Sequence, residues 1–90
     1  MTHTNQTAPD YSAQIIAQCN ASIQSTLKSI PATASNATKC HAMQACDRAA
    51  NAAYRAATAE QAHDDATRTR NMTMYRNNLD RAREIIRANK

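Results

Sequence analysis

Apolar residues recur between residues 11 and 30 at the spacing of one face of an α-helix. The stripe consists of Tyr11, Ile15, Ile16, Cys19, Ile23, Leu27 and Ile30. Steps of three and four residues place such side chains on one side of a helix. Thr7 and Asp10 have the spacing of a helix-capping pair, and Pro31 disfavours helical geometry at the residue before it. The pattern predicts a first helix over about residues 9–30.

A second apolar pattern begins after Ser35, a residue type that is favoured as a helix N-cap. Its members are almost all alanine: Ala42, Ala45, Ala49, Ala52, Ala56, Ala59, His63 and Ala66. A different stripe follows and consists of Met72, Tyr75, Leu79, Ala82 and Ile86. On a continuous helix, Met72 lies about 240° around the axis from Ala66. Two interpretations are open: one helix from Asn36 to the end of the chain, or two helices separated by a turn.

The segment between these two stripes favours the turn. Residues 67–73, "TRTRNMT", are rich in weak helix formers, and the apolar face changes there. A turn near residues 67–71 therefore separates the two helices. The predicted arrangement is a long alanine-rich central helix over about 36–67, flanked by antiparallel helices over about 9–30 and 71–88.

Composition supports an all-α fold. The chain of 90 residues contains no Gly and two Pro, which leaves few residues suited to the tight turns of β-hairpins. Its length fits a single domain. We therefore expect a flexible arm over residues 1–6 and one all-α, three-helix domain over residues 7–90.

Large apolar side chains are scarce in this chain, which has no Val, Phe or Trp. Small domains with thin cores are marginally stable on their own. A second alanine-rich seam leaves another face of the central helix for close packing; its members are Cys46, Ala50, Ala53 and Ala57. We therefore expect self-association through alanine-rich seams, with a dimer favoured.

Positive charge is concentrated in the last third of a chain whose formal net charge is +4. The candidates for contact with the phosphates of a nucleic acid or nucleotide are Arg68, Arg70, Arg76, Arg83 and Arg87. Arginine is suited to this role because its planar guanidinium makes bidentate contacts with phosphate. The alternative is a solvated face of ion pairs, because Asp80 and Glu84 lie three or four residues from several of these arginines.

Candidate metal and catalytic groups lack the spacing that their chemistry needs. Cys40 and Cys46 lie about 240° apart on one helix, so with His41 they do not form the ligand pairs of a zinc site. Glu60 and His63 have the i, i+3 spacing of di-iron carboxylate bundles, but the motif occurs once rather than twice. We expect no catalytic activity, no cofactor and no metal, with free thiols at the three cysteines.

Two surfaces are candidates for contact with a partner. Gln18, Ser22 and Ser25 lie on a neutral outer face of the first helix, which can dock against protein without desolvating charge. Tyr54 and Arg55 are bulky side chains within the alanine-rich central helix. We expect these five residues to contact a macromolecular partner.

The leading hypothesis is a non-enzymatic interaction protein that binds a protein partner. It would act as an inhibitor, adaptor or assembly element, of the kind that viruses and mobile elements encode. The alternative is nucleic-acid or nucleotide binding by the arginine-rich last helix, which a strong salt dependence would reveal. The sequence has no segment typical of a signal peptide or a membrane span, so the expected location is the cytoplasm.

Overall fold

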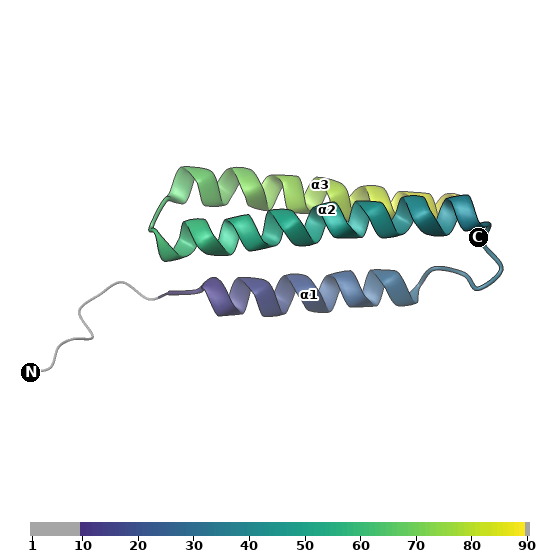
Figure 1. Ribbon diagram of the computed structural model, residues 1–90, viewed down its shortest axis with the longest axis horizontal. Coiled ribbons are helices and arrows are strands. Elements are labelled where there is room, and N and C mark those ends of the chain that lie inside the picture. Colours follow the sequence, from purple (N-terminus) through teal and green to yellow (C-terminus); the bar gives the residue numbers. More distant parts are fainter. Residues whose placement is uncertain (1–9, 90) are drawn as a thin grey trace, which may run out of the picture.

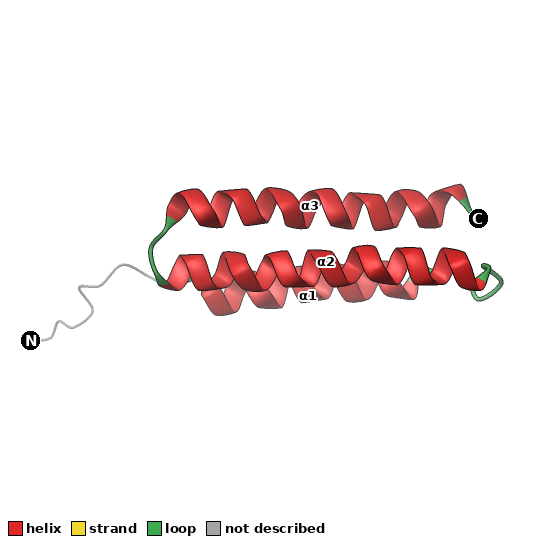
Figure 2. Ribbon diagram, turned by 45° about the horizontal axis from the view of Figure 1, so that its top comes forward, coloured by secondary structure: helices red, strands yellow, loops and turns green. Residues whose placement is uncertain are grey.

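The computed structural model describes residues 10–89. It contains three α-helices: α1 Ser12–Lys28, α2 Asn36–Gln61 and α3 Asp65–Ala88. The chain reverses direction at each connection, so that α2 runs back along α1 and α3 runs back along α2 (Figure 1). α2 lies between the other two helices (Figure 2). The predicted all-α, three-helix fold is confirmed for these residues, none of which forms a strand or a helix apolar enough to cross a membrane.

α1 begins slightly later than the sequence predicts. Its first residue is Ser12, whose backbone N–H donates to the Asp10 carboxylate at 2.8 Å. Hydrogen bonds from the side chain and backbone of Ser12 hold the pKa of Asp10 below its ordinary value. α1 ends at Lys28, two residues before the predicted end. Thr7 and the arm predicted over residues 1–6 lie outside the described residues.

Ser35 caps α2, as the sequence predicts. Its hydroxyl oxygen accepts a hydrogen bond from the backbone N–H of Thr38 at 3.1 Å. This bond satisfies one of the amides that have no carbonyl partner in the first turn of a helix. The start of α2 therefore coincides with the strongest capping signal in this part of the sequence.

The turn between α2 and α3 lies at residues 62–64, so the turn predicted near residues 67–71 is wrong. His63 adopts a left-handed backbone conformation, with φ 56°. The backbone N–H groups of His63 and Asp64 donate to carbonyls in the last turn of α2, at 3.0 and 2.8 Å. This pair of bonds is typical of a helix that ends in a left-handed residue. Glycine usually takes that position, and a chain without glycine gave no such signal.

α3 starts directly after this turn. The Asp64 carboxylate accepts a hydrogen bond from the backbone N–H of Thr67 at 3.1 Å and so caps the helix. Hydrogen bonds from the side chain and backbone of Thr67 hold the pKa of Asp64 below its ordinary value. Because Asp64 takes part in both the end of α2 and the start of α3, the connection is short. α3 consequently begins at Asp65 rather than near residue 71.

We call the alanine-rich pattern that begins at Ala42 the first alanine seam. It is buried in the contact between α2 and α3, which is the most extensive contact between helices. Its buried members are Ala42, Ala45, Ala49, Ala52, Ala56 and Ala59. The predicted continuation through His63 and Ala66 is wrong, because both residues follow the end of α2 and are exposed. Leu79 and Ala82 of α3 belong to the same buried cluster as Ala49. Alanine thus lets the backbones of α2 and α3 approach closely.

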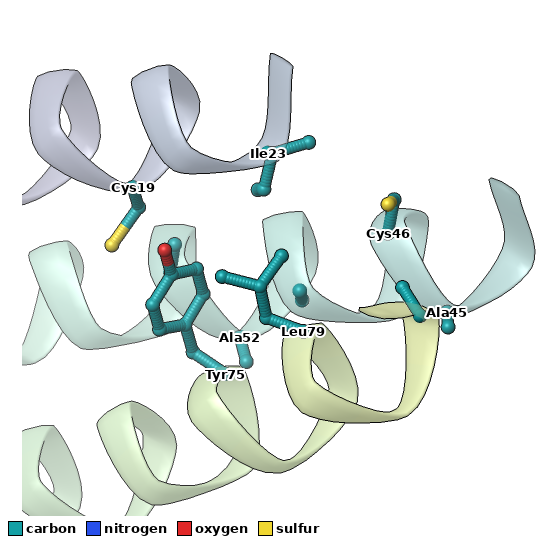
Figure 3. Close-up of a cluster of buried hydrophobic side chains, with 10 residues drawn as sticks. Cys19, Ile23, Ala45, Cys46, Ala52, Tyr75 and Leu79 are labelled. Carbon is teal, nitrogen blue, oxygen red and sulfur yellow. The ribbon is translucent and has the colours of Figure 1, made fainter. Parts of the chain in front are cut away.

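The second alanine seam is also buried within the chain. Cys46, Ala53 and Ala57 are each at most 3% exposed, and they lie about 100° around α2 from the first seam. Cys19 and Ile23 of α1 belong to the buried cluster that contains Cys46 and Ala53 (Figure 3). α1 therefore packs on this face. The seam is not available for the subunit contact that the sequence indicated.

Large side chains fill the space between α1 and α3. Tyr75 and Leu79 extend from α3 toward α1, and the hydroxyl of Tyr75 points toward the thiol of Cys19 (Figure 3). Burial raises the pKa of both Tyr75 and Cys19. α1 and α3 contact each other far less than either contacts α2. The small residues of α2 therefore make it the central helix, and the larger residues of its neighbours complete the core.

Candidate functional site

A groove of about 430 Å³ lies between α2 and α3 beside their turn, and we call it the α2–α3 groove. The residues that line it are Tyr54, Arg55, Thr58, Ala59, Ala62, Asp64, Thr67 and Asn71. Most of these side chains are small, so they leave the space between the two helices unfilled. The volume lies within the range of protein sites that take small ligands or the side chains of a partner. No residue of α1 lines the groove.

Tyr54 stands at the rim of the α2–α3 groove. Its side chain is 55% exposed, the largest exposure among the large apolar residues of the described chain. An aromatic ring with a hydroxyl offers a partner both a wide apolar surface and a hydrogen-bonding group. Tyr54 therefore has the properties of an anchor residue, because residues 10–89 leave more than half of it exposed.

Arg55 is fixed across the groove by a residue of the opposite helix. Its Nε donates to Oδ1 of Asn71 at 3.0 Å. The Nδ2 of Asn71 in turn donates to the backbone carbonyl of Thr67 at 2.9 Å. A hydrogen bond from a charged donor is stronger than a neutral one, and here one such bond orients the guanidinium. The remaining N–H groups of Arg55 are left for other acceptors.

Asn71 is the site residue that the sequence reasoning missed. It is 6% exposed and lies four residues before the buried Tyr75, at the position where the apolar stripe of α3 would continue. The sequence pattern predicts that the stripe begins at Met72, which is only half-buried. The sequence signal for Asn71 is that a polar residue stands at a position of the apolar stripe. A buried amide needs a hydrogen-bond partner, so such a residue indicates a polar contact inside the fold.

Arg68 of α3 is in an ion pair with a residue of α2. Its Nε lies 3.3 Å from Oε1 of Glu60 on α2, and its NH2 group lies 3.4 Å from Oδ1 of Asp65. Oε2 of Glu60 also accepts a bond from the backbone N–H of Tyr11 at 3.4 Å. This carboxylate of α2 therefore contacts α3 and the residue that precedes α1. Arg68, one of the five arginines that the sequence indicates for phosphate contact, supplies the contact on α3.

Two further arginines of the predicted phosphate set are in ion pairs along α3. Arg83 lies 4.0 Å from Asp80, and Arg87 lies 3.3 Å from Glu84. All four side chains are exposed, so the pairs are weak and screened by solvent. Arg83 and Arg87 thus have the ion pairs that the alternative predicts, and their contact with phosphate stays a prediction.

Arg70 and Arg76 are exposed and belong to no ion pair among residues 10–89. They are six residues apart, which places them about 240° apart around α3. Arg76, Arg83 and Arg87 lie within about 40° of one another around α3, whereas Arg70 lies at least about 100° from each of them. The five predicted arginines therefore do not form one continuous patch.

The predicted partner-binding residues divide into two groups. Tyr54 and Arg55 lie together at the α2–α3 groove. Gln18 and Ser25 are exposed on α1, a helix that contributes nothing to that groove. Ser22 is half-buried, and a hydrogen bond between its side chain and Tyr75 acts to lower the Tyr75 pKa. Ser22 therefore takes part in packing.

The cysteines do not resemble a reactive or metal-binding set. Cys19 and Cys46 are buried and Cys40 is exposed, and all three are free. Burial raises the pKa of the Cys19 and Cys46 thiols, which disfavours the thiolate that nucleophilic chemistry needs. In residues 10–89, no three His, Cys, Asp or Glu side chains come together as metal ligands. His63 follows the end of α2, so it does not share a helical face with Glu60.

Comparison of this chain with protein-family models, with curated proteins and with solved structures finds no match. What the α2–α3 groove offers chemically is an exposed aromatic ring, an oriented guanidinium and a hollow lined by small side chains. These three features are suited to binding another molecule.

Proposed function

We propose that this protein is a non-enzymatic interaction protein that binds a protein partner at the α2–α3 groove. The observation that carries the proposal is the pairing of exposed Tyr54 with oriented Arg55 at the rim of an unfilled hollow. By occupying a surface of its partner, the protein would act as an inhibitor, adaptor or assembly element. Its expected place of action is the cytoplasm, where free thiols persist.

The chemistry of the groove supports a protein partner. Tyrosine and arginine are among the residue types that contribute most to protein–protein binding when they lie around a desolvated pocket. The methyl groups of Ala59 and Ala62 offer an apolar floor to an aliphatic or aromatic side chain of the partner. Because Asn71 already orients Arg55, less conformational entropy is lost when the guanidinium meets an acceptor.

Self-association remains part of the proposal, but it needs a surface other than the alanine seams. Met43 and Tyr54 of α2 are 52% and 55% exposed. They are separated by eleven residues, which places them about 20° apart around the helix and roughly 16 Å apart along it. A homodimer would therefore bury this side of α2. Light scattering of the pure protein, with Met43→Glu as the disrupting variant, tests the dimer separately from the partner.

A photo-crosslinking experiment tests partner binding at the groove. A photoreactive phenylalanine analogue replaces Tyr54 in the full chain, and a second variant carries it at Asn77, an exposed residue of α3 outside the groove. We expect a specific crosslinked protein in the native cell from position 54 and not from position 77. Mass spectrometry then identifies the partner.

A matched pair of substitutions completes this test. Ala62→Arg places a long charged side chain in the groove, whereas Ala66→Arg makes the same change at an exposed residue that does not line it. Crosslinking from position 54 should disappear in the first variant and persist in the second. Equal crosslinking in both variants would show that the groove is not the binding site.

A further inference from the structure

We propose that a second surface of this protein binds the phosphate backbone of duplex nucleic acid. The surface lies on the outer side of the hairpin that α2 and α3 form. We call it the basic face, and its members are His41, Arg48 and Arg55 of α2 and Arg81 of α3. None of these residues belongs to the five arginines that the sequence indicated for phosphate contact, although Arg55 is among those indicated for a protein partner. The set crosses two helices.

The structure brings these residues together from distant parts of the sequence. His41, Arg48 and Arg81 line one hollow of about 100 Å³ between α2 and α3. Along α2, the three basic-face residues are spaced by seven, so each lies about 10 Å further along the helix with a drift of only about 20°. They form a straight column on a rigid helix. Arg81 stands beside this column, across the junction between the two helices.

Acidic side chains lie near this surface but form no ion pair with it within the described part of the chain. Asp64 lines the α2–α3 groove with Arg55, and Glu84 follows Arg81 by three residues in the sequence. The ion pairs found in residues 10–89 involve Arg68, Arg83 and Arg87, and none involves the basic face. Asp47 precedes Arg48 in the sequence but lies about 100° around α2 from it. Three guanidinium groups on one face therefore create a local positive potential, although the net charge of the chain is only +4.

The other groups on this surface fit phosphate oxygens. Gln44 lines the same hollow as Arg48, and amide side chains donate hydrogen bonds to the nucleic-acid backbone. The spacing of about 10 Å between Arg48 and Arg55 equals the rise of about three base pairs along the axis of a duplex. The basic face contains no Phe, Tyr or Trp among its four members, whereas proteins that bind single strands without sequence preference stack successive bases on several such rings. The surface therefore favours a duplex, bound through its backbone and without base recognition.

This inference does not depend on the proposed protein partner. Arg55 is the only residue that the basic face shares with the α2–α3 groove. The test below changes Arg48 and Arg81 and leaves the groove intact, so one proposal can fail while the other holds.

Fluorescence anisotropy with a labelled DNA duplex of about 20 base pairs tests the inference at salt concentrations from about 50 to 200 mM. Three arginine–phosphate contacts predict a slope of log K against log salt of about −2.7. The double variant Arg48→Gln/Arg81→Gln removes two contacts, so the slope should fall to about −0.9 and the affinity at about 50 mM salt should drop at least tenfold. An RNA duplex of the same sequence shows which nucleic acid is preferred.

A second double variant controls for net charge. Arg83→Gln/Arg87→Gln removes the same two charges from exposed arginines that are already in ion pairs, and it should change the affinity less than threefold. Equal losses in the two double variants would overturn the proposal, because the effect would then follow net charge alone. Equal or tighter binding of single-stranded DNA or of an acidic polypeptide would overturn it as well. All four substituted residues are exposed, and thermal unfolding verifies that the variants fold.

Discussion

The contact of α2 with α3 differs from its contact with α1 in two respects. The helices involved differ in length, and the connections and caps at their ends differ as well. α2 and α3 are 26 and 24 residues long, and a three-residue turn with a capped helix on its far side joins them. α1 has 17 residues, its N-cap residue Tyr11 makes no side-chain capping bond, and a longer loop separates it from α2. The α2–α3 hairpin is therefore the more firmly defined unit. α1 covers one face of it.

Both contacts nevertheless use the same kind of surface on α2. Each alanine seam accepts larger side chains from the facing helix, with Ile23 on the α1 side and Leu79 on the α3 side as the principal buried examples. The difference lies in how many such residues each neighbour supplies. The buried stripe of α3 extends from Asn71 to Ile86, whereas the apolar residues of α1 are in part only half-buried.

A substitution in the contact between α2 and α3 should have the largest effect on the free energy of unfolding. Leu79 is 4% exposed and contributes to the central cluster. Leu79→Ala leaves a cavity and should lower the free energy of unfolding by about 3 kcal/mol in urea denaturation. Leu27→Ala, at a half-buried position of α1, removes the same atoms and should cost less than half as much. Equal losses at the two positions would contradict the proposed difference between the contacts.

Native-state hydrogen exchange should resolve the same difference residue by residue. Helices with fewer buried contacts open at lower free energy than the rest of a fold. We expect the amides in the middle of α1 to exchange about tenfold faster than those in the middle of α2 and α3, which corresponds to about 1.4 kcal/mol. If all three helices exchange with one common free energy, α1 is not a separate unit.

The sequence predicted the helices well because their signals are local. The cap at Ser35 and the alanine periodicity of α2 both appear in the structure at the expected positions. The turn before α3 was misplaced because His63 takes a backbone conformation in which glycine is the usual signal. Local residue preferences could not indicate that this histidine would be held in that conformation by the hydrogen bonds around it.

The candidate site was harder to predict because it depends on which residues meet across helices. Tyr54 and Arg55 could be singled out as bulky residues among alanines, but their partner Asn71 is sixteen positions away. The meeting of Arg48 with Arg81 depends on the position of the turn, which sets the register between α2 and α3. An error of a few residues in the turn therefore leaves every helix recognisable and places the wrong side chains opposite one another.

The turn itself can be strengthened. His63 has φ 56°, a conformation that costs a residue with a Cβ about 1 kcal/mol more than glycine. His63→Gly should therefore raise the free energy of unfolding by up to about 1 kcal/mol. His41→Gly makes the same change inside α2, where glycine should instead cost about 0.4 kcal/mol, because histidine is already a weak helix former. If both substitutions lower the free energy of unfolding, the side chain of His63 makes contacts that stabilise the fold by more than its left-handed backbone conformation costs.

The smallest expected effect is the loss of stability at acid pH. It arises at the starts of α1 and α3. The pKa values of Asp10 and Asp64 are both below the ordinary value of 3.8 because each carboxylate accepts hydrogen bonds at the start of its helix. A carboxyl group with a lowered folded-state pKa stabilises the fold above its unfolded-state pKa. That contribution is lost as the pH falls through the folded-state value. Unfolding midpoints in urea should therefore decrease between pH 5 and pH 2.

Asparagine substitutions separate the two carboxylates, because asparagine can also cap a helix without titrating. Asp64→Asn should make the urea midpoint less sensitive to acid, since Asp64 caps a helix of the hairpin. Asp10→Asn should change that sensitivity less, because Asp10 lies at the start of the less extensively packed α1. A larger effect at Asp10 would mean that α1 unfolds together with the hairpin, and the two contacts of α2 would then form one cooperative unit.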